Sequence, residues 1–578
     1  MGTSDLVAKI YKEVVEIMRS EQVRRWYIFS LVIVLMTVVL VPGLVEAQEE
    51  RVVRELFIIS EPQSSSPDEY ETINLVVEAM QEAGINAVSH VIPWEQKADV
   101  VWYERDRWDM SGWQMTARPE RLDPDEFTYN LFHSSLVEDG YNFVGYKNTE
   151  YDEIAENQRV TIDLEERQKL IHRTQEIIAE DAVYNFTVHP EIMVAYNNQE
   201  FDPDSITELA GLGVRNFWTY VNVVPTGNNS DIRLNSNNEI QAINPLFISG
   251  TIDSWVTELV YDRLMRMSPD GLPEPWAAES VEWLDDTSVE VVIRENMYFH
   301  DGEPVTIEDV KYSFEVPFTG QVPMYRPFVD IIEDIEVVDD QTLVFHLERP
   351  YAPFETATLA KMNIIPKHVW EPIIEGMIDQ PENAESYQEE VPVGSGPFEY
   401  SHWARGDQVI LTANTDHFHS PQVERWILRV VPNMEAALGM IQSGELNFLS
   451  EYIGDRQLLS QIVEQNEGLN LSTGTSLGFR FLAFNHNRPP FDDVAFRRAV
   501  VALTDRDLIS QLAWRGFADD ADSVISPALD FWKNTDLDYS YGGVEEARRI
   551  LAEAGYEWDE EGRLLYPEGQ VEETEPSF

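Results

Sequence analysis

A strand–helix–strand pattern at residues 55–92 places the tightest limit on how this chain folds. Residues 55–60 (ELFIIS) predict a buried strand, and residues 68–83 carry apolar side chains at helical spacing. Gly84 stands where such a helix would end, and residues 85–92 again predict a strand. Because a helical crossover joins parallel strands, the pattern predicts an α/β lobe with a parallel sheet.

The length of the chain and its other periodic segments predict more than one such lobe. The chain has 578 residues, 43% of them hydrophobic, whereas one hydrophobic core rarely serves more than about 300 residues. Further elements are predicted as helices at 163–180 and 544–554, strands at 288–294 and 342–347, and a hairpin at 556–566. Asp163 is placed to cap the first of these helices. We therefore expect an α/β protein of two or more lobes.

Acidic side chains greatly outnumber basic ones along the whole sequence. There are 104 Asp and Glu residues against 41 Lys and Arg residues, which gives a net charge of −63. Nucleic acid is a poor partner for such a surface, because phosphate binding needs a basic footprint. At molar salt the Debye length falls to about 3 Å and screens the repulsion. We interpret the composition as that of a halophilic protein; the alternative is an acidic mesophilic protein.

An apolar run at residues 26–45 predicts a membrane-spanning or export segment. At about 1.5 Å per helical residue it is long enough to cross a hydrocarbon layer of about 30 Å. Arginines lie just before it, so the positive-inside rule places residues 1–25 in the cytoplasm and the bulk of the chain outside. Two interpretations remain open. The segment at 26–47 is either an uncleaved anchor, which the periodicity of the preceding residues favours, or a signal cleaved after Ala47.

Motifs for metal, cofactor or catalytic chemistry are weak or missing. The sequence has no cysteine, which excludes disulfides, thiolate nucleophiles and cysteine-ligated zinc. No His-Glu-x-x-His or Walker pattern occurs. His417 and His419 have the spacing of one strand face, and residues 299–302 include an Asp-Gly turn signal. We expect no metal site, no cofactor and no enzyme activity.

The most specific motif lies at residues 297–314, which read MYFHDGEPVTIEDVKYSF. Other characteristic segments follow or precede it in order, at residues 259–264, 274–280, 335–345, 391–398, 484–499 and 547–556. Together these segments resemble the peptide/nickel-type extracellular solute-binding proteins, family 5, the receptors of ABC importers. With its acidic composition, the chain resembles a haloarchaeal member of that family.

The order of these segments differs from the order in the family. Residues 231–569 resemble the first two thirds of a mature family member, and residues 56–181 resemble the last third. We interpret this as a circular permutation, with the cut between residues near 570 and residues near 55. Surface loops with nearby ends tolerate such changes. The alternative is an accidental fusion of fragments from two binding proteins.

The resemblance implies a two-lobed periplasmic-binding-protein-like fold of type II, with the N-terminal membrane helix added. The first lobe is expected at 215–485, and the second is expected to combine 51–214 with 486–578. Ligand would bind in the cleft between the lobes and be enclosed by hinge closure. The implied function is a receptor for peptides or a similar small solute at the extracellular face of the membrane, delivering to an ABC permease. The alternative is a sensory or scaffold protein that retained the binding fold.

The resemblance also implies ligand contacts from one loop. In peptide receptors of the family, an acidic residue shortly before an Asp-Pro stretch pairs with the α-amine of the ligand. By register Glu120 takes that place here, three residues before Asp123, and the expected ligand-binding residues are Trp113, Arg118, Glu120 and Asp123. A carboxylate facing an ammonium group suits the role. The alternatives are a solvated loop carboxylate, an arginine paired with local acids and a tryptophan of the core.

Overall fold

A computed structural model describes Lys12 and residues 51–569, apart from residues 106, 139, 228–229, 248–250, 379–383, 385–386, 388–390, 453, 538 and 540. Among the residues that it describes, no helix is both long and apolar enough to cross a membrane. The anchor or signal predicted at residues 26–47 lies outside this part of the chain.

Helices and strands alternate along the chain. The helices are α3 (Pro67–Glu82), α4 (Trp94–Tyr103), α5 (Asp125–Thr128), α6 (Thr149–Val160), α7 (Leu164–Glu180), α8 (Phe217–Asn222), α9 (Thr251–Val260), α10 (Ile307–Glu315), α11 (Arg326–Val329), α12 (Lys367–Met377), α13 (Met434–Ser443), α14 (Arg456–Glu464), α15 (Val494–Leu503), α16 (Arg506–Leu512) and α17 (Gly543–Glu553). The strands are β1 (Leu56–Ser60), β2 (Ala87–Val91), β3 (Met110–Met115), β4 (Tyr184–Asn197), β5 (Asp231–Ser236), β6 (Met265–Met267), β7 (Pro273–Pro275), β8 (Ala278–Asp285), β9 (Ser288–Ile293), β10 (Ile332–Val337), β11 (Thr342–Leu347), β12 (Phe398–Ala404), β13 (Gln408–Ala413), β14 (Arg425–Val430), β15 (Phe448–Leu449), β16 (Leu469–Thr475), β17 (Phe479–Phe484), β18 (Ala518–Asp520), β19 (Glu557–Trp558) and β20 (Leu564–Leu565).

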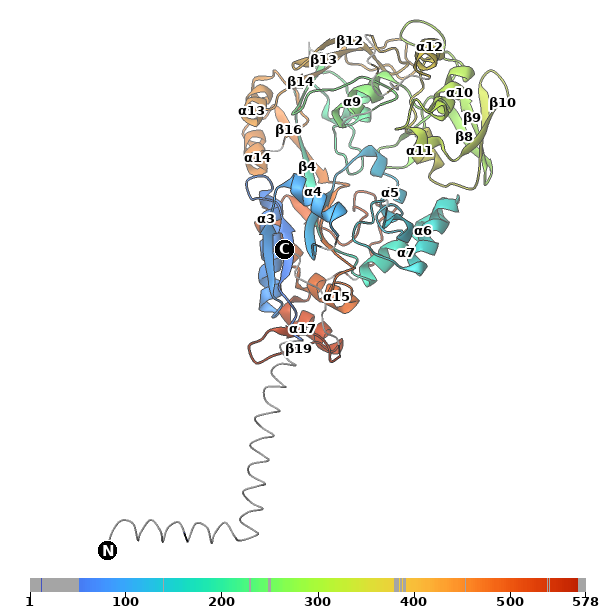
Figure 1. Cartoon of the computed structure of the whole chain (residues 1–578). Coiled ribbons are helices and arrows are strands. Elements are labelled where there is room, and N and C mark those ends of the chain that lie inside the picture. Colours follow the sequence, from blue (N-terminus) through green and yellow to red (C-terminus); the bar gives the residue numbers. More distant parts are fainter. Residues whose placement is uncertain are drawn as a thin grey trace.

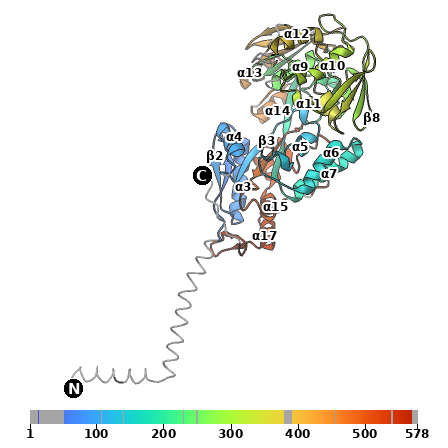
Figure 2. The same cartoon turned by 45° about the vertical axis from the view of Figure 1, so that its right-hand side comes forward.

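The long strand β4 joins two bodies, one above the other in Figures 1 and 2. Its first half pairs with β17 and its second half pairs with β16, both antiparallel. The lower body holds β1–β3, α3–α7, β17 and α15–α17, and the upper body holds β5–β16 (Figure 1). The main sheet runs through both in the order β12-β13-β14-β5-β15-β4-β17-β3-β1-β2. Two backbone passages, β4 and the β16–β17 segment, therefore connect the bodies.

The predicted α/β unit is present in the lower body. β1 pairs with β2 in parallel, with Leu56 opposite Ala87, and α3 crosses between them. β1 also pairs in parallel with β3. The inward side chains of this unit, such as Ile58 and Ile73, are fully buried. The apolar pattern read from residues 55–92 therefore predicted this sheet correctly.

The first and last described segments of the chain pack against each other in the lower body. The Val53 amide donates a hydrogen bond to Leu564 O at 2.9 Å, and the Tyr566 amide donates one to Arg51 O at 2.8 Å. The Leu564 amide donates to Gly84 O, also at 2.9 Å. The predicted hairpin of β19 and β20 thus continues into the segment before β1, and one apolar core includes residues from both segments.

Gly84 provides a test of this packing. Its φ is +91°, and a Cβ there would lie 2.3 Å from Gly562 O and 2.8 Å from the Trp558 ring. An added methyl group cannot be accommodated without moving the hairpin, and the left-handed backbone adds about 1–2 kcal/mol. We expect Gly84→Ala to lower the free energy of unfolding by about 2–4 kcal/mol, measured by urea denaturation in molar salt.

Gly302 is the matched control for this substitution. Its φ is +90°, but no atom lies within 4 Å of the Cβ position. Gly302→Ala therefore carries the backbone cost without the clash and is expected to lose only about 1–2 kcal/mol. Equal losses in the two variants would contradict the close packing of the C-terminal hairpin on Gly84.

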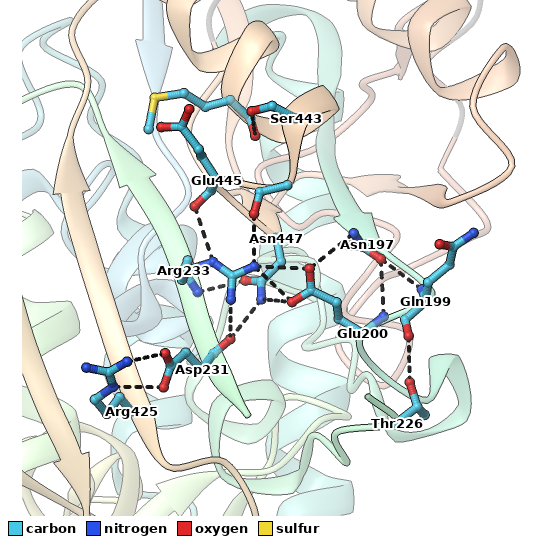
Figure 3. Close-up of polar contacts among 12 residues, drawn as sticks. Asn197, Gln199, Glu200, Thr226, Asp231, Arg233, Arg425, Ser443, Glu445 and Asn447 are labelled. Carbon is cyan, nitrogen blue, oxygen red and sulfur yellow. Dashed lines mark hydrogen bonds and ion pairs between the residues drawn. The ribbon is translucent and has the colours of Figure 1, made fainter. Parts of the chain in front are cut away.

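A polar network fixes β5 in the upper body (Figure 3). Arg233 donates to the Glu200 carboxylate at 2.8 and 3.0 Å, and Asn447 donates to the same carboxylate at 3.1 Å. Asn447 also donates to Asp231 O at 2.8 Å. On the other side of the strand, Arg425 pairs with the carboxylate of Asp231. The network links the end of β4 to β5 and β14, so the upper part of the sheet is anchored beside the crossing strand.

Candidate functional site

A pocket lies where the two bodies meet. The cavity itself has a volume of about 80 Å³, and about 850 Å³ is reached only when the space open to solvent around it is counted. The lower body contributes Ala117, Pro119 and Leu122 from the loop after β3. The upper body contributes residues of α8, α9 and β6, with Thr356 and its neighbours. Because its walls come from both bodies, rotation about the connecting strands would open and close this pocket.

Most charged side chains on the pocket wall are basic. They are Arg215, Arg263, Arg266 and Lys361, together with one acid, Glu258. The Arg215 guanidinium lies 4.1 Å from the centre of the Trp255 ring. The Arg266 guanidinium lies 3.5 Å from the centre of the Phe217 ring. Burial lowers the pKa of Arg266 to about 9, and nearby Arg263 adds to this effect. Arg266 therefore remains charged at neutral pH.

Asp123 connects the loop below the pocket to both bodies. Its buried carboxylate accepts hydrogen bonds from Arg167 at 2.6 and 3.0 Å and from Thr356 Oγ1 at 2.7 Å. Thr356 lies in the upper body and lines the pocket. Burial alone would raise the pKa of Asp123, but Arg167 and the hydrogen bonds hold it below its ordinary value. Asp123 is thus ionised and bridges the two bodies.

Arg159 makes a second connection between the bodies. The Ala352 amide donates a hydrogen bond to Arg159 O at 2.6 Å. The Arg159 guanidinium lies 4.0 Å from the Tyr129 ring centre and 5.3 Å from that of Tyr351. Tyr351 belongs to the upper body and Tyr129 to the lower one, so the two bodies are held together beside the pocket in this conformation.

Trp113 lies in β3 among other aromatic side chains of the lower body. Its ring centre is 5.1 Å from that of Trp94 and 5.4 Å from that of Phe143, and Lys97 Nζ lies 5.6 Å away over the ring. Trp113 is 6% exposed. The residues that line the pocket begin after it, in the loop that follows β3.

Arg118 and Glu120 lie in that loop. Arg118 is exposed and stands between two residues that line the pocket, Ala117 and Pro119. Glu120 belongs to a short 3-10 helix, Pro119–Arg121, and its side chain lies outside the described part of the structure. Of the four predicted ligand residues, Arg118 and the Glu120 backbone lie next in sequence to residues of the pocket wall without lining it, and Asp123 has a bridging position.

Two other motifs have local explanations. Residues 474–478 (GTSLG) fit the Gly-x-Ser-x-Gly pattern, but they join strand β16 to strand β17, whereas the hydrolase motif joins a strand to a helix. Ser476 Oγ there accepts a hydrogen bond from the Gly478 amide at 3.0 Å. His417 and His419 lie in a turn between strands β13 and β14.

These two histidines contact different partners: His417 approaches Asp262 at 3.3 Å and His419 approaches Asn222 at 2.8 Å. Among the described residues, no group of three or more His, Cys, Asp or Glu side chains is placed to hold a metal ion.

The basic residues of the pocket were missed by reasoning from the sequence. Arg215 and Arg266 are 51 positions apart and belong to no motif, so only the fold places both at one wall. A signal was present, since Arg215 stands among apolar and aromatic residues in the run GLGVRNFWTY. An arginine in apolar surroundings is uncommon in a chain with so few basic residues.

Comparison with known proteins shows partial matches to binding proteins. The chain is 26% identical over 330 residues to the oligopeptide-binding protein AppA of Bacillus subtilis, covering 56% of this chain and 59% of that protein. It is 24% identical over 345 residues to the dipeptide-binding protein of Escherichia coli, covering 55% and 62%. It is 26% identical over 340 residues to heme-binding protein A of Haemophilus influenzae, covering 54% of this chain and 59% of that protein. The chain spans 59% to 62% of the length of these relatives.

Solved structures include similar proteins. A periplasmic oligopeptide-binding protein of Thermotoga maritima aligns with a TM-score of 0.46 and 22% identity, covering 60% of this chain and 68% of the other. NikZ of Campylobacter jejuni aligns with a TM-score of 0.44 and 21% identity, covering 59% of this chain and 66% of NikZ.

A family profile gives the family assignment. The profile of the bacterial extracellular solute-binding proteins, family 5 (middle part), matches residues 273–576. This match includes the motif at 297–314 and confirms the resemblance seen in the sequence. Because it covers more than half of the chain, the chain belongs to the family 5 extracellular solute-binding proteins.

Proposed function

We propose that the protein is the solute-binding receptor of an ABC importer. The observation that carries the proposal is the pocket between two bodies joined by β4 and the β16–β17 segment. A solute bound there would touch both bodies and favour their closed arrangement, because it would gain contacts that the open arrangement lacks. The closed receptor would then dock on the permease. Membership in a family of binding proteins also supports a receptor rather than an enzyme.

The proposed ligand is a peptide or a similar small solute. The experiment uses the full chain purified in molar salt, with co-purified solutes identified by mass spectrometry and di- to pentapeptides titrated by calorimetry. We expect one solute class to bind with a micromolar or lower dissociation constant, about −8 kcal/mol or more favourable. A protein that carries no solute and binds no member of the panel would contradict the receptor function.

Glu120 is proposed as the partner of a ligand ammonium group, and Trp113 and Arg118 are proposed as further ligand contacts. Asp123 is proposed to position the loop, since its carboxylate already bridges Arg167 and Thr356. Removing a charge-assisted hydrogen bond costs about 1.5–3 kcal/mol, so Glu120→Gln should weaken peptide binding roughly tenfold to a hundredfold. Calorimetry with the panel above measures this change.

The control for Glu120→Gln is Glu165→Gln, which removes one exposed acid from α7 in the lower body. Its affinity for peptides should equal that of the unmodified protein. Unchanged affinity in Glu120→Gln would remove Glu120 from the site.

The permuted order and the location of the protein are further proposals. The packing of residues 51–53 on the hairpin of β19 and β20 supports a permuted second lobe over a fusion of unrelated fragments. The boundaries 51–214, 215–485 and 486–578 are proposed for the two lobes, except that β17 (Phe479–Phe484) is assigned to the second lobe because it pairs with β3. The apolar run at 26–47 supports tethering at the outer face of the membrane, and the net charge of −63 supports life at high salt.

A further inference from the structure

The pocket between the bodies has the opposite charge to the rest of the protein. The chain as a whole carries 104 acidic and 41 basic side chains. On the pocket wall the balance reverses, with four basic side chains and one acid. A local excess of positive charge in a cleft raises the concentration of anions there. Such a reversal points to an anionic ligand group.

The four basic side chains of the wall lack acidic partners. Within the described part of the chain, none of these side chains (Arg215, Arg263, Arg266 and Lys361) makes an ion pair. Elsewhere in the upper body arginines do, for example Arg233 with Glu200 and Arg425 with Asp231. Some other interior arginines are paired: Arg167 binds Asp123 at 2.6 Å, and Arg54 binds Asp109 at 2.6 Å. Arg497 and Arg506 are buried without an ion pair among the described residues, and backbone carbonyls accept most of their hydrogen bonds. The pocket differs in that four unpaired basic side chains lie on one wall.

Arg266 shows how strongly this wall is desolvated. The residue is 5% exposed, and its guanidinium donates only to backbone carbonyls, Glu258 O at 2.8 Å and Tyr261 O at 3.2 Å. Its Nε is buried and has no hydrogen-bond acceptor among the described residues. An unpaired charge in such surroundings is costly, because hydration is lost and no anion replaces it.

Arg215 is placed to meet a ligand directly. It is half-buried, lies over the Trp255 ring at 4.1 Å from the ring centre, and makes no hydrogen bond to the described residues. Stacking on the indole ring fixes the guanidinium and leaves its N–H groups for an acceptor. Trp218, Trp255 and Phe217 add apolar surface to the same wall.

We propose that the pocket selects a solute that carries a carboxylate group next to an apolar body, with Arg215 as the direct partner and Arg266 as the supporting charge. This inference rests on the proposed receptor function and adds the chemical class of its ligand. A planar carboxylate matches the fork of a guanidinium and can accept two hydrogen bonds from it. The ion pair would supply the counter-charge that the folded chain lacks.

The test compares free acids with their amides. The probes are di- and tripeptides ending in leucine or phenylalanine, each as the free carboxylate and as the C-terminal amide, together with 3-phenylpropionate and 3-phenylpropionamide. Calorimetry on the full chain in molar salt should show the acids binding at least tenfold more tightly than the matched amides. Arg215→Gln should reduce this ratio to near one, and Arg215→Lys should keep part of it.

Arg405→Gln is the matched control, because Arg405 also lies over a tryptophan, Trp403 at 4.2 Å, but on the exposed β12–β13 hairpin. It removes the same charge and should leave the acid-to-amide ratio unchanged.

Equal affinity of acids and amides for the unmodified protein would overturn the inference and leave the receptor function standing. An unchanged ratio in a folded Arg215→Gln variant would overturn it too. If the Arg215→Gln variant does not fold, the ratio of acid to amide affinity in the unmodified protein alone tests the inference. Binding of neither series, with no co-purified solute, would overturn the receptor function and the inference with it.

Discussion

Asp109→Asn should lower the free energy of unfolding by about 3–5 kcal/mol. The Asp109 carboxylate is fully buried and binds Arg54 at 2.6 and 2.7 Å, Arg488 at 2.9 Å and the Phe57 amide at 3.0 Å. Asparagine keeps the shape but removes the charge, so two guanidinium groups lose their shared counter-ion in the interior. Urea unfolding followed by tryptophan fluorescence in molar salt measures the loss.

Glu557→Gln is the control for this prediction. Glu557 pairs with Arg51 at 2.9 Å, also in the lower body, but its side chain is 58% exposed. Exposed pairs contribute about 0–1 kcal/mol. A loss in Asp109→Asn as small as that in Glu557→Gln would show that Arg54 and Arg488 do not depend on Asp109. In that case the segment before β1 and the segment after β17 would be held to β3 by other contacts.

Asp123→Asn should cost about 3 kcal/mol and also reduce the dependence of stability on pH. Arg167 is buried and would lose its partner at 2.6 Å. The pKa of Asp123 in the folded protein lies below its ordinary value, so the unfolded chain binds this proton first as the pH falls. The stability from this group is present above about pH 4 and is lost as the pH falls through the folded pKa.

Unfolding curves between pH 3 and 7 would separate this effect from a loss of ligand contact. Thr356→Val is the control, because it removes only the 2.7 Å hydrogen bond from Thr356 to Asp123. That variant should lose about 1 kcal/mol and retain the acid-side slope. An Asp123→Asn variant of unchanged stability would contradict the bridging position of this carboxylate.

Local patterns in the sequence predicted much of the secondary structure, because each depends on neighbouring residues. The helix expected at 163–180 is α7, Leu164–Glu180, and Asp163 accepts a hydrogen bond from the Glu166 amide at 2.9 Å, as a capping residue does. The strands expected at 288–294 and 342–347 are β9 and β11. In β9 fully buried side chains alternate with half-buried ones, as the alternating pattern of the sequence predicted.

Features that depend on distant residues were beyond a local pattern. β4 pairs with β17 and β16, although nearly 300 positions separate Thr187 from Arg480, whose carbonyl it binds. Nothing in the sequence of β4 indicates that it enters both bodies. The same holds for the pocket, because Arg215 and Arg266 meet only after α8, α9 and β6 have packed together.

The family resemblance directed attention to one loop, and the structure adds the opposite wall of the pocket. Arg118 lies beside the lower wall. Arg215 and Arg266 stand on the other wall, and resemblance to peptide receptors did not single them out. The charge balance of the sequence offered a signal for them, because basic residues are few in so acidic a chain and those in apolar runs are candidates for a specific role.

The arrangement of the lower body has a consequence for biosynthesis. Strands β1, β3 and β4 emerge from the ribosome long before β17, which pairs with both β3 and β4. Thr187 and its partner Arg480 are 293 positions apart, which at about 5–20 residues per second is a delay of about 15–60 s. During translation β3 and β4 therefore each keep an unpaired edge until β17 has been synthesised, and the upper body waits equally long for β16 (Leu469–Thr475).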